Sequence, residues 1–187
     1  MSERAVATRW VTFRSGTDEI RGYLAEPPTV RPRGGIVTAP ENLGVTEHRQ
    51  AETRRLAEEG FVVLVVDPYS RIGGKPPQDY RTQEERRVKA FHAARDETAV
   101  PDMQAGIEFL SRLGSVDPAR IGALGYCLGG GTVLALSATS TSLACAVVLY
   151  ALPILPARYR PDGKPLSRIE LAPRIGCPMQ LHFGDAD

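Results

Sequence analysis

The chain has 187 residues, enough for one domain with a substantial hydrophobic core. Its 23 basic and 22 acidic residues nearly cancel, so we expect no nucleic acid or anionic membrane as a partner. The longest apolar run, residues 143–152, is too short for a transmembrane helix, and residues 1–14 lack the apolar stretch of a secretory signal. Three cysteines without disulfide or metal-site spacing favour reduced thiols in the cytoplasm.

The first third of the chain predicts a β-hairpin and then a strand–helix–strand unit. Residues 7–15 and 20–26 alternate between apolar and polar side chains around a turn, as hairpin strands do. Residues 35–39 form a short apolar run, and Thr46 is suited to cap a helix that ends near Glu59. The continuous apolar run over 61–66 is typical of a central parallel strand.

The middle of the chain predicts two helices. A charged helical stretch covers about residues 82–97, and Pro101 is expected to open a second, amphipathic helix that Gly114 closes. The predicted core contacts of this second helix are Met103, Ile107, Phe109 and Leu110.

The last third predicts further strands of the same sheet. Residues 117–120 predict a turn that leads into an apolar strand, and two more strands are expected at 144–150 and 179–183. A Pro- and Arg-rich excursion without clear periodicity covers 152–174. Strands that alternate with helices predict a single α/β domain over residues 1–187, with a mostly parallel central sheet flanked by helices.

The most informative segment is Gly125-Tyr126-Cys127-Leu128-Gly129, which follows an apolar strand and precedes a helix-compatible run. This is the nucleophile-elbow pattern of α/β-hydrolases, with cysteine in the serine position. Glycines on either side of the nucleophile allow a turn too tight for side chains, and the N-terminus of the following helix favours a thiolate. The alternative is a small buried cysteine in a chance match.

Three segments, in this order along the chain, resemble signatures of the dienelactone hydrolase family of α/β-hydrolases. They are Pro40-Glu41-Asn42-Leu43-Gly44, Val66-Asp67-Pro68-Tyr69-Ser70-Arg71 and Gly125-Tyr126-Cys127-Leu128-Gly129-Gly130. The resemblance implies an α/β-hydrolase fold and cleavage of a small-molecule ester or lactone, of the carboxymethylenebutenolidase type, through a cysteine acyl-enzyme. It implies no metal and no organic cofactor.

The resemblance also assigns roles to individual residues. Cys127 is the expected nucleophile, and Glu41 is the expected carboxylate that contacts the resting thiol and helps govern its ionisation. Taken without the resemblance, Glu41 is equally well a surface-loop carboxylate. The backbone N–H groups of Leu128 and Asn42 are the expected oxyanion hole. Asp187 is expected as the triad acid, with the neighbouring Asp185 as the alternative.

The family's histidine has no counterpart in these residues. His48, His92 and His182 all precede the expected acid, whereas the order in this fold is nucleophile, acid, histidine. We therefore expect residues 1–187 to be a fragment without the C-terminal helix and strand that bring in the base. The alternative is a natural short form that lacks the base. The alternative function is a non-catalytic domain that binds a small molecule or a partner protein.

The sequence also bears on the charge of the substrate. The resemblance implies that an arginine within residues 81–87 binds the carboxylate of an anionic substrate, although the register there is not fixed. Solvated charges on a helix face are the alternative for any one of these arginines.

Overall fold

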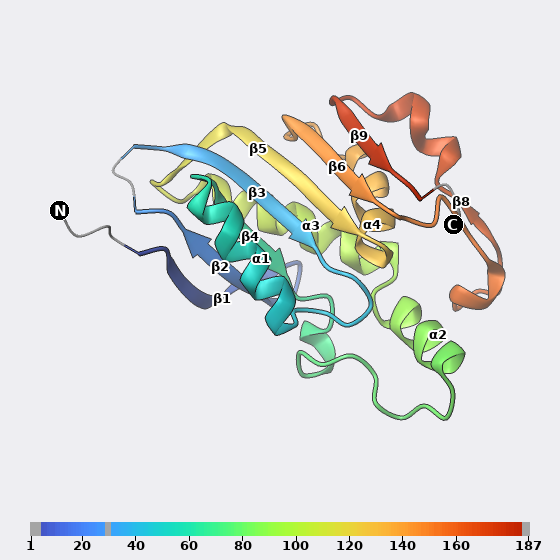
Figure 1. The fold of residues 1–187 in the computed structure, drawn as a ribbon. Helices are drawn as coiled ribbons and strands as arrows, with labels where there is room; N and C mark the ends of the chain where they lie inside the picture. Colours follow the sequence, from blue (N-terminus) through green and yellow to red (C-terminus); the bar gives the residue numbers. More distant parts are fainter. Residues whose placement is uncertain (1–4, 29–30, 185–187) are drawn as a thin grey trace.

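A computed structural model describes residues 5–28 and 31–184 (Figure 1). These residues form a seven-stranded sheet in the order β1-β2-β4-β3-β5-β6-β9. Strands β4, β3, β5, β6 and β9 run parallel, and β2 pairs antiparallel with both β1 and β4. The strands are β1 (Ala7–Ser15), β2 (Asp18–Glu26), β3 (Arg33–Ala39), β4 (Val62–Val66), β5 (Val116–Tyr126), β6 (Cys145–Leu149) and β9 (Met179–His182).

Helices cover both faces of the sheet. Figure 1 shows α1 (Glu47–Glu58) on one face and α3 (Asp96–Ser111) with α4 (Leu128–Ser137) on the other. Helix α2 (Gln83–Ala93) lies near the carboxyl ends of the central strands. This arrangement is the α/β-hydrolase fold, and it confirms the predicted mostly parallel sheet flanked by helices.

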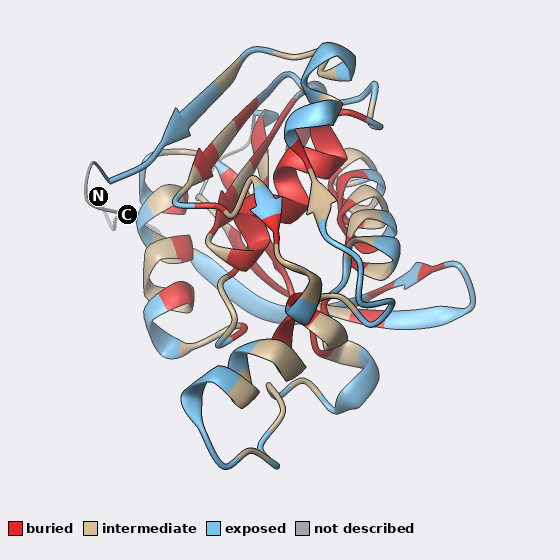
Figure 2. Ribbon diagram, turned by 90° about the vertical axis from the view of Figure 1, so that its right-hand side faces the viewer, coloured by how far each residue is buried: buried red, intermediate tan, exposed pale blue. Residues whose placement is uncertain are grey.

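The core lies between the sheet and its helices, where Figure 2 shows the buried residues gathered. All five residues of β4 are buried, as its continuous apolar sequence predicts for a central parallel strand. Leu64 in β4 joins Met103, Ile107 and Leu110 of α3 in one hydrophobic cluster. Phe109 is partly buried and packs against the same cluster. All four predicted core contacts of this helix are therefore confirmed.

The predicted hairpin and first helix are confirmed. Strands β1 and β2 pair in register from Ala7 with Glu26 to Ser15 with Asp18. Thr46 caps α1, because its side chain accepts a hydrogen bond from the backbone N–H of Arg49 at 3.3 Å.

The predicted helix boundaries around residues 82–101 were wrong. Helix α2 already ends at Ala93, and α3 begins at Asp96, so Pro101 lies inside α3 and does not open it. Asp96 and Glu97 explain the early start, because acidic side chains in a first turn suit the helix dipole and both pair here with arginines of the excursion. These tertiary contacts outweigh the one backbone donor that Pro101 lacks.

The turn predicted over residues 117–120 lies inside β5 and is a local irregularity of that strand. Its pairing with β3 shifts register between Arg33 and Gly35, and the Asp117 carboxylate accepts a hydrogen bond from the N–H of Ala119 at 3.0 Å. The side-chain acceptor is the turn signal that the sequence contains, but the strand continues through it.

The excursion over 152–174 contains only short elements, as its sequence predicts. They are β7 (Ile154–Leu155), β8 (Leu166–Ser167) and the 3-10 turns η2 (Ala157–Tyr159) and η3 (Ile169–Arg174), to which η1 (Ser70–Ile72) adds a third turn earlier in the chain. Within 5–28 and 31–184, no helix combines the length and apolar character needed to cross a bilayer.

Candidate active site

Cys127 lies at the carboxyl end of β5 and immediately before α4. Its backbone adopts φ 51° and ψ −112°, a left-handed conformation that is rare for a residue with a side chain. Its N–H donates to the carbonyl of Leu149 at 2.9 Å, which ties the turn to the end of β6. The geometry is the strained strand–turn–helix of a nucleophile elbow.

The glycines around Cys127 are required by close backbone approach. A Cβ at Gly125 would lie 2.5 Å from the carbonyl oxygen of Gly129, and a Cβ at Gly129 would lie 2.2 Å from that of Ala39. Both distances are far below any contact that a side chain tolerates. The first and last glycines of the Gly-x-Cys-x-Gly pattern therefore let α4 pack directly on β5 and β3.

A cavity of about 790 Å³ opens above Cys127. Its wall comes from the loop after β3, from α2, from the end of β6 and from the excursion. The lining residues include Asn42, Arg86, Arg87, Phe91, Cys127, Tyr150, Leu152, Arg158, Tyr159 and Phe183. Phe91 stacks on Tyr159 with ring centroids 4.6 Å apart, so α2 and the excursion meet in an aromatic contact at the wall.

The second signature segment holds the loop that carries Asn42. The hydroxyl of Tyr69 donates to the carbonyl of Asn42 at 2.8 Å, and the N–H of Tyr69 donates to the Asp67 carboxylate at 3.0 Å. Tyr69 is 1% exposed, and burial raises the pKa of its phenol above the ordinary value, so the hydroxyl remains a donor. Arg71 of the same segment forms two hydrogen bonds with Asp102 of α3.

Glu41 lies in an ion-pair cluster with Arg49 of α1. The Nη2 of Arg49 donates to Oε1 of Glu41 at 3.1 Å, and its Nε faces Oε2 at 3.0 Å as an ion pair. Arg49 also pairs with Glu52, and its guanidinium lies 3.7 Å from the ring centroid of Tyr126. The sequence did not single out Arg49. An arginine among the charged residues of an amphipathic helix is usually interpreted as a solvated side chain.

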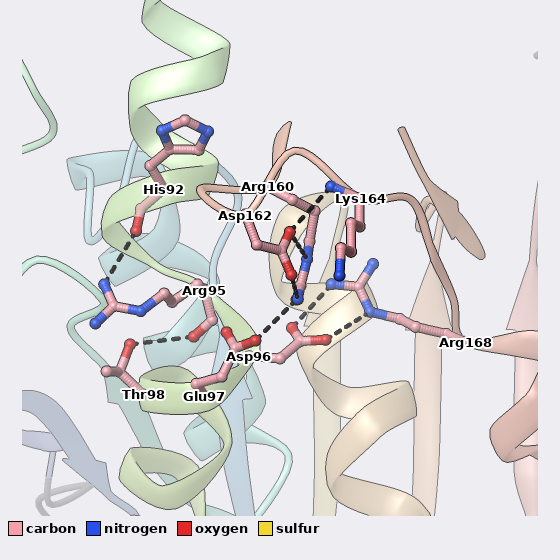
Figure 3. A network of polar contacts seen from close by, with 9 residues as sticks. All are labelled: His92, Arg95, Asp96, Glu97, Thr98, Arg160, Asp162, Lys164 and Arg168. Carbon is pink, nitrogen blue, oxygen red and sulfur yellow. Dashed lines mark hydrogen bonds and ion pairs between the residues drawn. The ribbon is translucent and has the colours of Figure 1, made fainter. Parts of the chain in front are cut away.

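Ion pairs hold the excursion against the start of α3 (Figure 3). Arg168, 4% exposed, donates to both carboxylate oxygens of Asp96 at 2.8 and 3.0 Å, and to the carbonyl of Leu152 at 3.0 Å. Arg160 lies between Glu97 and Asp162, at 2.9 and 2.8 Å from their carboxylate oxygens. We call the contacts of Arg168 with Asp96 and Leu152 the clamp. Because Leu152 lines the cavity, the clamp fixes one wall of that cavity.

Three arginines face the cavity. Arg86 and Arg87 of α2 lie within the stretch 81–87 that was predicted to contain a substrate-binding arginine, and Arg158 comes from the excursion. Arg158 pairs with Glu84 at 2.8 Å, whereas the Nε of Arg86 is buried without a hydrogen-bond partner among the described residues. The wall therefore carries positive charge, part of which is not matched by a hydrogen bond.

None of the three histidines lines the Cys127 cavity. His48 is exposed on α1, His92 faces a separate groove beside residues 72–79, and His182 is exposed in β9. Asp185 and Asp187 lie outside the described residues, although Phe183 and Gly184 line the cavity just before them in the chain. Across residues 5–28 and 31–184, no three His, Cys, Asp or Glu side chains gather as a metal site.

Proteins of related sequence include a lactonase and a carboxymethylenebutenolidase. A protein from Bradyrhizobium sp. assigned as a 2-oxo-3-(5-oxofuran-2-ylidene)propanoate lactonase is 27% identical over 188 residues, which cover 100% of this chain and 73% of that protein. A carboxymethylenebutenolidase from Pseudomonas putida is 29% identical over 134 residues, 70% of this chain and 56% of the relative. The match thus spans little more than half of the Pseudomonas enzyme.

A solved structure shares the fold. The crystal structure of a protein from Klebsiella pneumoniae assigned as a dienelactone hydrolase superposes with a TM-score of 0.81 at 22% identity, covering 95% of this chain and 72% of that one. The model of the dienelactone hydrolase family matches residues 20–187, nearly the whole sequence. The chain therefore belongs to the dienelactone hydrolase family.

Proposed function

We propose that this protein hydrolyses a small-molecule ester or lactone through an acyl-enzyme on Cys127. The observation that carries the proposal is the elbow itself: a cysteine in strained backbone, at the head of α4, opening into a cavity of about 790 Å³. Family membership supports ester or lactone cleavage as the reaction class. A strained turn that only packed a buried cysteine would have no reason to face a cavity.

The proposed chemistry begins with the thiol proton. Glu41 accepts this proton, and the sulfur attacks the carbonyl carbon of the substrate, so that a C–S bond forms and the carbonyl becomes an oxyanion. The N–H groups of Leu128 and Asn42 stabilise the oxyanion, since Leu128 is in the first turn of α4, where backbone donors have no partner within the helix. The C–O bond then breaks, and the leaving oxygen takes up the proton.

Hydrolysis of the thioester requires a second proton acceptor to activate water. We assign Asp187 as the triad acid on the family resemblance, and the residues just before its loop, Phe183 and Gly184, line the cavity. No histidine lines that cavity. We therefore expect residues 1–187 to form the acyl-enzyme readily and to hydrolyse it slowly.

The positive wall supports an anionic substrate. Arg86 and Arg87 present guanidinium groups on the α2 side, where a planar carboxylate can take two parallel hydrogen bonds. The stacked Phe91 and Tyr159 rings offer an apolar surface for the body of such a substrate.

The test is a burst experiment with an aryl ester. We expect rapid release of about one phenol per chain, followed by slow turnover, and one acyl group on Cys127 by peptide mass spectrometry. Cys127→Ala should abolish the burst. Cys145→Ala is the matched control and should keep it, because Cys145 is more exposed than Cys127 but has no elbow.

The absence of a histidine from the cavity wall also favours a second candidate, a non-catalytic domain that binds small carboxylates. That candidate predicts no burst, and acylation that follows exposure, with Cys145 modified before Cys127. A folded protein that gave this result would exclude the hydrolase proposal.

A further inference from the structure

Arg49 is 3% exposed although it carries a charge. Burying a guanidinium is costly unless hydrogen bonds and opposite charges compensate it. Burial lowers the pKa of Arg49, but the Glu41 and Glu52 carboxylates more than offset this and hold it above the ordinary value, so the side chain stays charged. A positive charge is therefore held beside Glu41, the residue before Asn42.

Two of the contacts of Arg49 lead directly to the proposed active site. Two of its nitrogens hold both carboxylate oxygens of Glu41, at 3.0 and 3.1 Å. Its guanidinium also lies over the ring of Tyr126, the residue before Cys127, with the central carbon 3.7 Å from the ring centroid. Arg49 thus connects the proposed proton acceptor to the backbone of the proposed nucleophile.

Glu52 completes the cluster from the next turn of α1. It pairs with Arg49 through one oxygen and accepts a hydrogen bond from the Tyr126 hydroxyl at 2.6 Å through the other. Burial and this acceptor raise the pKa of Tyr126, so its hydroxyl remains a donor. The Tyr126 ring is therefore held from two sides.

Glu41 and Cys127 have a common neighbour in Tyr150. Both interact electrostatically with the phenol of Tyr150, whose ring lies 6.3 Å from that of Tyr126. The charged and titratable groups around Glu41 are therefore Arg49, which contacts it, and Tyr150, which interacts with it electrostatically. Glu52 and Tyr126 are joined to Glu41 through Arg49.

We propose that Arg49 is a positioning residue: it holds the Glu41 carboxylate in one orientation, ready to accept the Cys127 proton. This rests on the proposed function. In the step it serves, the S–H bond of Cys127 breaks and an O–H bond forms on Glu41, while Arg49 keeps its own protons. Arg49 is not among the residues that line the cavity, so it acts on the substrate only through Glu41.

The test is the pH dependence of Cys127 alkylation by iodoacetamide, measured site by site. Thiolate formed by loss of a proton to water falls about tenfold for each unit that the pH falls, whereas thiolate formed by transfer of the proton to Glu41 does not change with pH while the pair keeps that proton. Transfer to Glu41 therefore predicts a plateau at the acid end of the rate profile. Glu41→Gln and Arg49→Gln should each remove the plateau and lower the rate in that pH range by at least about tenfold.

The double variant separates a route through Glu41 from an independent effect. If Arg49 acts through Glu41, adding Arg49→Gln to Glu41→Gln lowers the rate no further. Arg49→Lys keeps the charge but cannot hold both oxygens in the same way, so it should retain part of the plateau. Arg55→Gln, an exposed charge on the same helix, is the control and should keep the whole profile.

Each contrary outcome has a distinct meaning. A plateau that survives Arg49→Gln, or a double variant clearly slower than Glu41→Gln, overturns the role of Arg49 while leaving Glu41 in the mechanism. A plateau that survives Glu41→Gln removes Glu41 from the proposed function and Arg49 with it. If Arg49→Gln does not fold by circular dichroism, Arg49→Lys decides, and an unchanged profile in that variant overturns the proposal.

Discussion

At the scale of single residues, the turn at Cys127 requires glycine at position 129, because there is no room for a Cβ atom. The Cβ position of Gly129 lies 2.2 Å from the carbonyl oxygen of Ala39 and 2.5 Å from that of Pro40, both fixed backbone atoms. We expect Gly129→Ala to lower the free energy of unfolding by about 2 kcal/mol or more, as overpacking does. Urea unfolding measures it. Gly114→Ala, with no atom within 4 Å, should change stability by less than about 0.5 kcal/mol.

The same residues show what a sequence reveals locally. The strand–turn–helix around Cys127 was predictable because the cysteine, its two glycines and the strand and helix around it are contiguous in the chain. Arg49 was not, because its partners come from a loop, from the next helical turn and from the distant Tyr126. Nothing within α1 distinguishes it from the solvated Arg55. Local signatures therefore predict the turn at Cys127, whereas the contacts of Arg49 depend on tertiary structure.

At the scale of elements, one buried ion pair joins α3 to the excursion. Arg168→Met would leave the Asp96 carboxylate, 15% exposed, without its partner, and we expect a loss of about 3 kcal/mol in unfolding free energy. Arg112→Met is the control, because Arg112 is 77% exposed and its pair with Glu108 is worth little. Adding Asp96→Asn to Arg168→Met should recover part of the loss. Equal stability of Arg168→Met and Arg112→Met would contradict the clamp.

Elements with local signals were predicted better than those fixed by distant contacts. The β1–β2 hairpin and the capped start of α1 were foreseen because alternation and a capping threonine act over a few residues. The start of α3 was misplaced because Asp96 gains its partner, Arg168, only when the excursion folds back. In the sequence, Pro101 indicated the start of a helix, but in the structure it lies inside α3.

At the scale of the whole molecule, Asp67 ties stability to pH. Burial raises its pKa above the ordinary value of about 3.9, and its Oδ2 is buried without a hydrogen-bond partner among the described residues. The native state therefore binds the proton more tightly than the unfolded state. Stability should fall as pH rises from about 4 through the raised pKa of Asp67.

The difference between variants isolates this effect. The unfolding free energy of the wild type minus that of Asp67→Asn should decrease with rising pH across that window, measured by denaturant titration at each pH. Asp162 provides the opposite sign, since hydrogen bonds from Arg160 and from the backbone of Lys164 lower its pKa. The corresponding difference for Asp162→Asn should decrease as pH falls. A flat difference for Asp67→Asn would contradict the raised pKa.

Two main-chain hydrogen bonds near the cavity set a spacing across three strands. The N–H of Cys127 donates to the carbonyl of Leu149, and the N–H of Tyr150 donates to the carbonyl of His182 at 2.7 Å. The first bond fixes the end of β5 against the end of β6, and the second fixes the end of β6 against the end of β9. Because both bonds join main-chain atoms, they do not depend on the side chains of β6 and β9, whereas β5 must keep Gly125. A one-residue insertion in β6 would displace the ends of β5 and β9 relative to one another by about 3.3 Å, so the spacing at the candidate site depends on the length of β6.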